Sequence, residues 1–466
     1  MAPLRDIVYR HSPYTLQNIL ISCYGLYLRS IRYGQPYLQA LRFLEQADGW
    51  NSARIETWQA ERLDALVKAA VTDVPYYRER YAHLIRPGER LDAGKLARDF
   101  PILPKEIVKT HPEQFVTTTL ADRERTTVFT SGTTGAPLEV IAAKTAVARN
   151  FAFFSHFLQR CGLDPFATSV TFAGRLIVPS SQQRAPFWRY NAAMRTWLFS
   201  SYHINAASVS AYVAKLEEIQ PTYIDSYPSA IYALARYVLG RNIAHSIRPQ
   251  AIVTSSETLT ALQREAVESA FQCKVYDQYG SAEMAAFAAQ CAAGSYHVHP
   301  LYGVAEVVDR EGRPCAPGEA GDLVLTGLVN EAMPLLRYRI GDQAAWRVGP
   351  CPCGSVHPAL QGILGREDDY IVTPEGNHVG RLDPLFKGLK GLLEAQIVQQ
   401  STDRVEILVV PGPAFDAAAK AKLVGSLRER VGTRMLIEVR EVTSIPRTRN
   451  GKFRSVVSNI KSVPAP

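Results

Sequence analysis

The stretch TTVFTSGTTGAPLEV (126–140) gives the first indication of how this chain folds. Its six small residues, Thr130 to Gly135, lie between two runs with β-branched side chains. Such a loop offers successive backbone N–H groups and hydroxyls that can converge on an anion. A Walker-type loop would end in Gly-Lys-Ser/Thr and open a helix, whereas Gly135 precedes Ala-Pro-Leu and both flanks predict strands. The pattern predicts a strand–loop–strand phosphate cradle, with a flexible surface turn as the alternative.

The composition is that of a soluble globular protein with more than one domain. The chain has 466 residues, of which 47% are hydrophobic and 21% charged. The net charge of +8 suits an anionic ligand such as a nucleotide, or simply a basic surface. No dense Lys/Arg run is present, which argues against nucleic-acid binding. Seven cysteines without a secretory signal indicate reduced thiols and a cytoplasmic location.

The most apolar early segment is ILISCYGLYL (19–28). It is too short to span a bilayer, and Arg29 and Arg32 interrupt the apolar run directly after it. No small-residue cleavage site comes after it, so it is not a signal peptide. The segment predicts a buried or interfacial helix without stable membrane insertion, and a transient membrane contact stays open.

Strands and helices alternate through the middle of the chain, which predicts an α/β fold with a largely parallel, wrapped sheet. The expected strands are TYID (222–225), AIVTSS (251–256) and KVYDQYG (274–280), and the expected helices cover 229–239 and 260–271. Short strands between Gly- and Pro-rich turns then predict an antiparallel β-subdomain over about 300–364.

A small α+β unit comes next along the chain. Its expected elements are RVEILVV (404–410), a helix over 416–431 and MLIEVREV (435–442). We therefore expect a large N-terminal domain over 1–365, which contains the β-subdomain, and a small mobile C-terminal domain over 366–466.

Three further stretches accompany the loop: YDQYGSAEM (276–284), PLLRYRIGDQ (334–343) and IPRTRNGKFR (445–454). Singly, each is typical of an ordinary turn or a solvated lysine. Together and in this order they resemble the adenylate-forming superfamily of acyl-CoA ligases, over about 75–455. The phenylacetate–CoA ligase branch, including its capsule-associated ligase-like proteins, is the most similar. Other stretches similar to that branch are VPYY (74–77), FPILPK (100–105), FAGRLIVP (172–179) and SYPSAIYALA (226–235).

The resemblance implies that a carboxylate attacks the α-phosphate of ATP, giving an acyl-adenylate and pyrophosphate, and that coenzyme A then displaces AMP. It implies Mg²⁺ on Glu283, a hard cation on an oxygen ligand, adenine against Tyr279 and Gly280, and ribose near Asp342 and Arg366. Ser256 and Glu257 occupy the place of the adenine-lining loop. The Lys that often follows the motif's proline is replaced by Leu138, as is common in this branch. The residues implied to hold the β- and γ-phosphates are Thr130, Ser131, Gly132, Thr133, Thr134 and Gly135.

By the same resemblance, Lys452 matches the catalytic lysine that bridges the substrate carboxylate and the AMP phosphate. It would offset charge that develops in the transition state. Asp368 matches the hinge about which the small domain turns between the half-reactions. The pocket for the acid is expected between the phosphate loop and 276–284, with Tyr202, His203 and Tyr227 as candidate lining residues, each of which can instead be simple core.

A cysteine and histidine cluster predicts a further metal site. Cys351 and Cys353 share one turn, and Cys291 precedes both His297 and His299. Zinc in structural sites takes four Cys or His ligands, but the C-x-C spacing is unusual, two histidines compete for one place, and unrelated reduced thiols are the alternative. Similar branch members look like zinc proteins, which favours Zn²⁺ on Cys291, His297, Cys351 and Cys353.

The leading hypothesis is thus an ATP-dependent, AMP-forming acid–CoA ligase, with an aryl acid as one candidate substrate. An adenylate-forming ligase that passes the acyl group to an amine or a carrier-protein thiol is the alternative. A non-catalytic nucleotide-binding paralogue would need neither Lys452 nor Glu283. A zinc-dependent nucleic-acid-binding protein would need a basic stripe beside the cysteines, and CPCGSVHPALQG (351–362) contains none.

Overall fold

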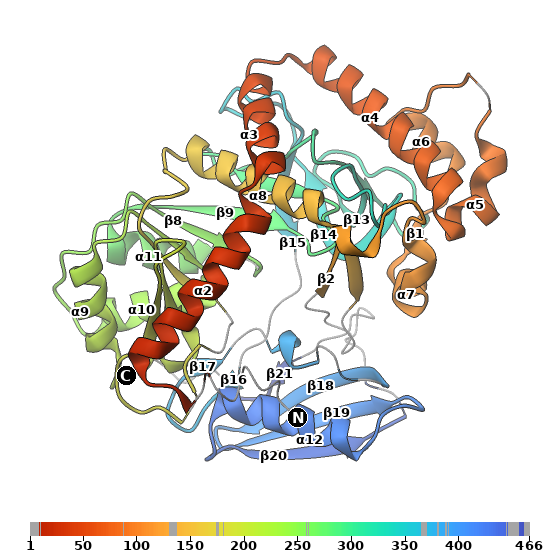
Figure 1. Cartoon of the computed structure of the whole chain (residues 1–466). Helices are drawn as coiled ribbons and strands as arrows, with labels where there is room; N and C mark the ends of the chain where they lie inside the picture. The colour runs from red at the N-terminus through yellow and green to blue at the C-terminus, as the bar shows by residue number, and fades with distance from the viewer. Residues whose placement is uncertain are drawn as a thin grey trace.

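The structure is a computed structural model (Figure 1). It describes residues 9, 11–86, 88–129, 138–173, 177–179, 181–257, 259, 261–364, 371–379, 382–386, 389, 391–443, 445 and 456–460. Within these ranges the chain forms one large mixed sheet with helices packed on it, and a separate C-terminal sheet. The α/β class is therefore confirmed.

One half of the large sheet is parallel. Its strands β4, β6, β7, β8 and β9 pair in parallel, and β5 closes this edge in antiparallel orientation. From β6 to β9, consecutive parallel strands are joined through helices, as the alternating pattern predicts, whereas β5 lies between β4 and β6 along the chain. The bounds of these strands are β4 Ser169–Ala173, β5 Trp188–Asn191, β6 Thr196–Ser200, β7 Tyr223–Ser226, β8 Ala251–Ser255 and β9 Lys274–Gly280.

The other half of the sheet is antiparallel and continuous with the first half through the β9–β10 pair. The expected β-subdomain is therefore an extension of the large sheet. Short β1 (Leu103–Pro104) joins it in parallel on β14. The remaining strands are β10 Phe287–Gln290, β11 Tyr296–Val298, β12 Gly303–Val308, β13 Ala320–Gly327, β14 Tyr338–Trp346 and β15 Ala359–Leu364. A separate hairpin, β2 (Arg125–Phe129) with β3 (Glu139–Ala143), flanks the 130–137 loop.

The helices begin and end where local signals place them. The Asn51 side chain accepts a hydrogen bond from Arg54 N at the start of α4, and Pro228 is the first residue of α10. Among the described helices, none has the length and hydropathy needed to cross a bilayer. The helices of this part are α2 Tyr14–Arg32, α3 Gln35–Ala47, α4 Ser52–Asp73, α5 Pro75–Tyr81, α6 Ala93–Asp99, α7 Lys105–Thr110, α8 Lys144–Arg160, α9 Val209–Ile219, α10 Pro228–Gly240 and α11 Ala261–Phe271.

The C-terminal unit, blue in Figure 1, has a four-stranded sheet in the order β20-β19-β18-β21 and one long helix, α12. Its core is apolar, and Tyr202 of the large part packs into the same cluster. The predicted boundary at 365/366 falls in residues 365–370, outside the described residues, and stays a prediction. The elements are β16 Ile371–Val372, β17 His378–Val379, β18 Leu392–Ser401, β19 Arg404–Pro411, α12 Ala417–Val431, β20 Leu436–Glu441 and β21 Val456–Ser458.

Candidate active site and metal centre

The carboxyl ends of β7, β8 and β9 form one edge of the large sheet, which we call the carboxyl edge. Ser226 pairs with Thr254, and Ser255 pairs with Gln278, so the three strands end together. Ligands of open α/β sheets bind at such an edge, because loops diverge there and leave a crevice. The predicted nucleotide residues at the ends of β8 and β9, Ser256 and Tyr279 among them, are thereby adjacent.

Tyr279 and Asp342 meet directly. The Tyr279 hydroxyl donates a 2.7 Å hydrogen bond to Oδ2 of Asp342, although 63 residues separate them. Tyr279 lies on β9 and Asp342 on β14, in two different halves of the large sheet. The fold thus brings together the two residues predicted for adenine and ribose.

Glu283 lies in the turn between β9 and β10, and its side chain is only 4% exposed. Lys105 Nζ lies 3.2 Å from Glu283 Oε1, and the Tyr338 hydroxyl donates to the same oxygen at 3.0 Å. Burial by itself raises the pKa of Glu283, but the Lys105 charge and these hydrogen bonds outweigh it and hold the pKa below its usual value. The site therefore presents a buried, ionised carboxylate.

A second buried carboxyl, Asp277, lies on β9 before this turn. Thr254 Oγ1 donates to its Oδ1, and the Tyr296 hydroxyl donates to Oδ2 at 2.7 Å. Burial raises the pKa of Asp277 to about 6, against the lowering effect of these hydrogen bonds. The group links β8, β9 and β11 beneath the carboxyl edge. It lies in the stretch YDQYGSAEM (276–284), but the sequence analysis gave it no role.

Tyr202 and His203 lie away from this cluster. They follow β6, four strands from β9 in the sheet, or about 19 Å at the usual strand spacing. Both are buried, and His203 is satisfied on both ring nitrogens, by Ser200 Oγ at 2.7 Å and by the Pro179 carbonyl at 3.1 Å. Tyr227, which follows β7 at the carboxyl edge, lies two strands from β9.

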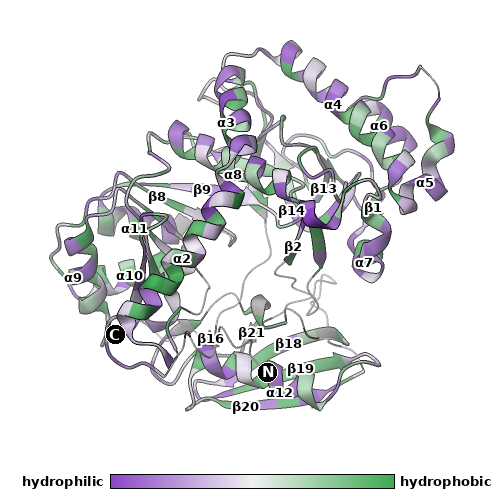
Figure 2. Cartoon of the chain, viewed as in Figure 1, coloured by the Kyte–Doolittle hydropathy of each residue, from purple (hydrophilic) through white to green (hydrophobic). Residues whose placement is uncertain are grey.

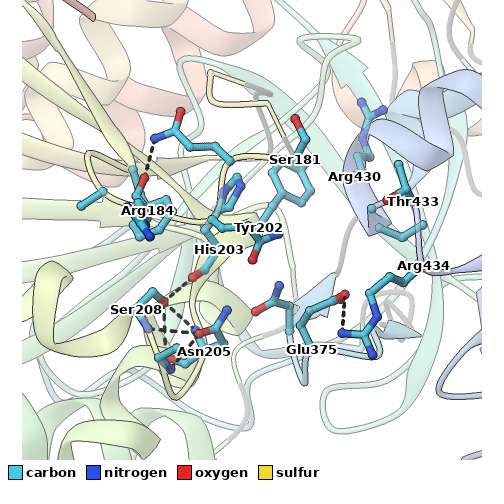
Figure 3. A pocket seen from close by; sticks show the side chains of 18 of the residues that line it. Ser181, Arg184, Tyr202, His203, Asn205, Ser208, Glu375, Arg430, Thr433 and Arg434 are labelled. Atoms are coloured by element: carbon cyan, nitrogen blue, oxygen red, sulfur yellow. Dashed lines mark hydrogen bonds and ion pairs between the residues drawn. The ribbon is translucent and has the colours of Figure 1, made fainter.

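Tyr202 and His203 instead line a cavity of about 300 Å³ between the large part and the C-terminal unit. Figure 3 shows them on one wall, with Arg430, Thr433 and Arg434 of the C-terminal unit on the other. Arg434 also pairs with Glu375 at 3.6 Å, and both side chains line this cavity. Tyr202 and His203 therefore belong to the contact between the two parts.

Several predicted site residues lie outside the described residues: the phosphate loop Thr130 to Gly135, Arg366, the hinge Asp368 and the lysine Lys452. Their roles stay predictions. The strands on either side of the phosphate loop do lie within the described residues. β2 and β3 pair up to Phe129 and Glu139, so the loop connects two adjacent antiparallel strands, as its sequence predicts.

The four predicted zinc ligands lie together. One ligand atom from each of Cys291, His297, Cys351 and Cys353 falls within 4.8 Å of the others, and theirs is the one such cluster among the described residues. Cys291 Sγ lies 3.7 Å from Cys351 Sγ, and Cys353 Sγ lies 3.2 Å from His297 Nε2. The β10–β11 hairpin and the turn between β14 and β15 supply two ligands each.

His297 rather than His299 is the histidine of this cluster. Its Nδ1 lies 3.0 Å from the His357 carbonyl, which leaves Nε2 toward the thiols once Nδ1 donates its proton. Metal-binding histidines are commonly oriented by this kind of second hydrogen bond. His299 is buried against Phe153, at a ring distance of 4.8 Å, so it packs in the core.

Lys105 and Tyr338 are the site residues that sequence reasoning missed. Both lie in stretches that carry the resemblance, FPILPK (100–105) and PLLRYRIGDQ (334–343), but neither was assigned a role. The available signal was Lys105 itself, a charged residue directly after the mostly apolar run FPILP (100–104). The pairing of β1 with β14, which positions Lys105, cannot be read from local sequence.

Comparison with known proteins shows what this chain is similar to. Residues 371–459 match the family model of the CapK C-terminal domain. Over 462 residues the chain is 27% identical to Protein CapK of Staphylococcus aureus, covering 98% of this chain and 100% of that protein. It is 26% identical to the phenylacetate-coenzyme A ligase of Thermus thermophilus over 276 residues, 53% of this chain and 62% of the ligase.

The fold is also that of a solved ligase. The 2-hydroxyisobutyryl-CoA ligase in complex with 2-HIB-AMP and CoA superposes with a TM-score of 0.59 at 22% identity, covering 88% of this chain and 90% of the ligase. At this identity the likeness establishes the fold. The sequence relatives confirm the resemblance inferred from the ordered motifs: the chain is a relative of CapK and of the phenylacetate–coenzyme A ligases.

Proposed function

We propose that this protein activates a carboxylic acid with ATP through an acyl-adenylate and then transfers the acyl group to coenzyme A, releasing AMP and pyrophosphate. The observation that carries the proposal is the convergence of Tyr279, Asp342 and Glu283 at one end of the sheet, from strands far apart in sequence. A surface turn with no ligand would not require a buried, ionised carboxylate beside a paired tyrosine and aspartate.

In this proposal, Tyr279 presents its ring to adenine while its hydroxyl is held by Asp342, whose carboxylate accepts from the ribose hydroxyls. Glu283 would hold Mg²⁺, since its carboxylate is ionised and fixed by Lys105 and Tyr338, as a hard cation requires. Bound Mg²⁺ would neutralise phosphate charge as pyrophosphate leaves. Lys452 would supply the positive charge between the acid and the α-phosphate.

The acid and the acceptor are proposed from the relatives. The named substrates of the relatives are phenylacetate and 2-hydroxyisobutyrate, so a small aryl or branched acid is the class we assign. Of the three candidate lining residues, Tyr227 follows the strand nearest to β9 and is the one we assign to the acid. No observation in the described residues favours an amine or a carrier protein, and the relatives support coenzyme A.

We further assign a structural Zn²⁺ to Cys291, His297, Cys351 and Cys353. The support is the donor set, in which one hairpin and one turn bring four N and S atoms close together, as is typical of closed zinc sites. The cluster is away from the carboxyl edge, and we give it no part in the reaction. Its effect would be to tie the β14–β15 turn to the β10–β11 hairpin.

The test is ATP–pyrophosphate exchange with CoA absent, over a panel that includes phenylacetate, 2-hydroxyisobutyrate and other aryl and aliphatic acids. We expect acid-dependent exchange for the native protein and loss of exchange in Glu283→Gln. Glu113→Gln, which changes an exposed carboxylate, is the matched control and should exchange normally. Absence of exchange in protein that binds ATP, or equal exchange in Glu283→Gln, would contradict the proposal.

A further inference from the structure

Helix α2 is attached to the body of the protein by its polar face. Asn18 Oδ1 accepts from Tyr190 N at 3.0 Å, Ser22 Oγ accepts from Ala192 N at 3.0 Å, and Gln17 is buried against Arg189. Tyr190 belongs to β5, the edge strand of the large sheet, and Ala192 follows it. These bonds satisfy backbone groups that an open edge would leave exposed.

The opposite face of α2 is apolar and exposed. We call it the outer face and define it by Leu16, Ile19, Cys23, Leu26 and Tyr27, which recur at helical spacing. Ile19 is 57% exposed, Leu26 61% and Tyr27 58%. Figure 2 shows hydrophobic residues along α2 on the outside of the molecule. Surface helices normally turn their apolar stripe inward, so this reversed orientation indicates that another apolar phase covers the outer face.

The charged residues near the outer face indicate that the apolar phase which covers it is a membrane. Residues 11–44 contain no Asp or Glu, and the next acids along the chain are Glu45 and Asp48. Exposed Arg29 lies in the last turn of α2, where it also donates to the Ala193 carbonyl, and exposed Arg42 lies in α3. Apolar side chains with exposed tyrosines and arginines, and without acids, are typical of helices that lie in the interface of an anionic membrane. In a symmetric pair of two α2 helices, this segment would offer its arginines no carboxylate partner.

We propose that the outer face of α2 docks the protein on an anionic lipid bilayer, with α2 parallel to the membrane plane. The apolar side chains enter the boundary between headgroups and acyl chains, and the positive charge of exposed Arg29 and Arg42 attracts anionic lipid. The short apolar run of 19–28 suits this depth, since it cannot reach across the hydrocarbon core. This inference is independent of the reaction proposed above.

The experiment is co-sedimentation of the full chain with vesicles of phosphatidylcholine, with and without phosphatidylglycerol, at low and high salt. We expect binding to the anionic vesicles that weakens with salt, and at least about tenfold weaker binding for the double variant Ile19→Gln/Leu26→Gln. The control is Val356→Gln/Leu436→Gln, which removes two side chains of similar exposure elsewhere, 51% and 54%. Since all four side chains are exposed, melting temperatures should stay close to native and separate a docking defect from misfolding.

Two kinds of result would overturn the proposal. One is native protein that binds neither vesicle, or binds both equally, or loses binding as much in the control variant. The other is native protein that is dimeric by light scattering and becomes monomeric in Ile19→Gln/Leu26→Gln without any vesicle binding, which would assign the outer face to a second copy of this chain.

Discussion

The ammonium group of Lys105 lies 3.2 Å from Oε1 of Glu283, across a sequence separation of 178 residues. The pair is largely buried, with the Lys105 side chain 16% exposed and that of Glu283 4% exposed. It fixes the carboxylate that we assign to Mg²⁺, and it joins helix α7 to the carboxyl edge.

Lys105→Met should destabilise the protein by about 2–4 kcal/mol, because it leaves a buried carboxylate without its cation. The measurement is urea unfolding. Lys420→Met, on α12, breaks a 3.7 Å pair with Glu441 in which the two side chains are 42% and 53% exposed, and should change stability by about 0.5 kcal/mol or less. The double variant Lys105→Met/Glu283→Gln should recover part of the loss, and strictly additive effects would show that the two residues do not interact.

The metal centre predicts about one zinc per chain in protein prepared without added metal. Cys351→Ser should lower both the zinc content and the melting temperature, because a closed site contributes folding free energy directly. Cys315→Ser, outside the cluster, is the control and should keep its zinc. If metal-free protein has the native melting temperature, the four residues do not form a structural zinc site.

Asp277 predicts a specific pH dependence of stability. Its folded-state pKa of about 6 lies above the ordinary value of 3.8, so the folded state holds the proton more tightly than the unfolded state. Its contribution is therefore greatest below about pH 4 and is lost as the pH rises through about 6, by about 3 kcal/mol in total. Asp277→Asn should lack this component, so the difference in unfolding free energy between variant and native protein should change between pH 4 and pH 7. An identical pH profile in both proteins would refute the assignment.

Much of the fold could be predicted because its signals are local. The strands expected at 222–225, 251–256 and 274–280 are β7, β8 and β9 to within a residue at each end, since alternation and flanking turn residues mark them. The helix expected over 229–239 is α10, where Pro228 sets the start. The cluster with His297 as its histidine was predicted from residue type and the resemblance, and the structure brings these four residues together.

Long-range pairing could not be predicted. Turns such as 281–284 are usually exposed to solvent, so nothing in the local sequence predicts that Glu283 is buried. The structure instead buries it against Lys105 and Tyr338, through strand pairings remote in sequence. The candidate pocket residues Tyr202 and His203 show the opposite case. Their residue types suited an acid pocket, but β6 places them at the contact with the C-terminal unit.

Lys452 should separate the two half-reactions in single-turnover rapid quench. Lys452→Ala should slow adenylate formation by ~10²–10³-fold, because a transition-state charge contact is lost. Given synthetic acyl-adenylate and coenzyme A, the same variant should transfer at nearly the native rate. Asp368→Pro should keep adenylate formation but fail in acyl transfer, since a fixed φ restricts the hinge. Equal losses in both halves for Lys452→Ala would rule out an alternating C-terminal domain.

Attack of the substrate carboxylate on the α-phosphate of ATP is the central step of the proposed reaction, and isotope transfer tests it most directly. An acid that supports pyrophosphate exchange is supplied with ¹⁸O in its carboxylate, together with ATP, Mg²⁺ and coenzyme A, and the nucleotide product is analysed by mass spectrometry. We predict AMP that contains one ¹⁸O atom from the acid, because the adenylate's bridging oxygen stays with phosphorus when the thiol displaces AMP. ADP with ¹⁸O in orthophosphate, or AMP without label, would contradict this step.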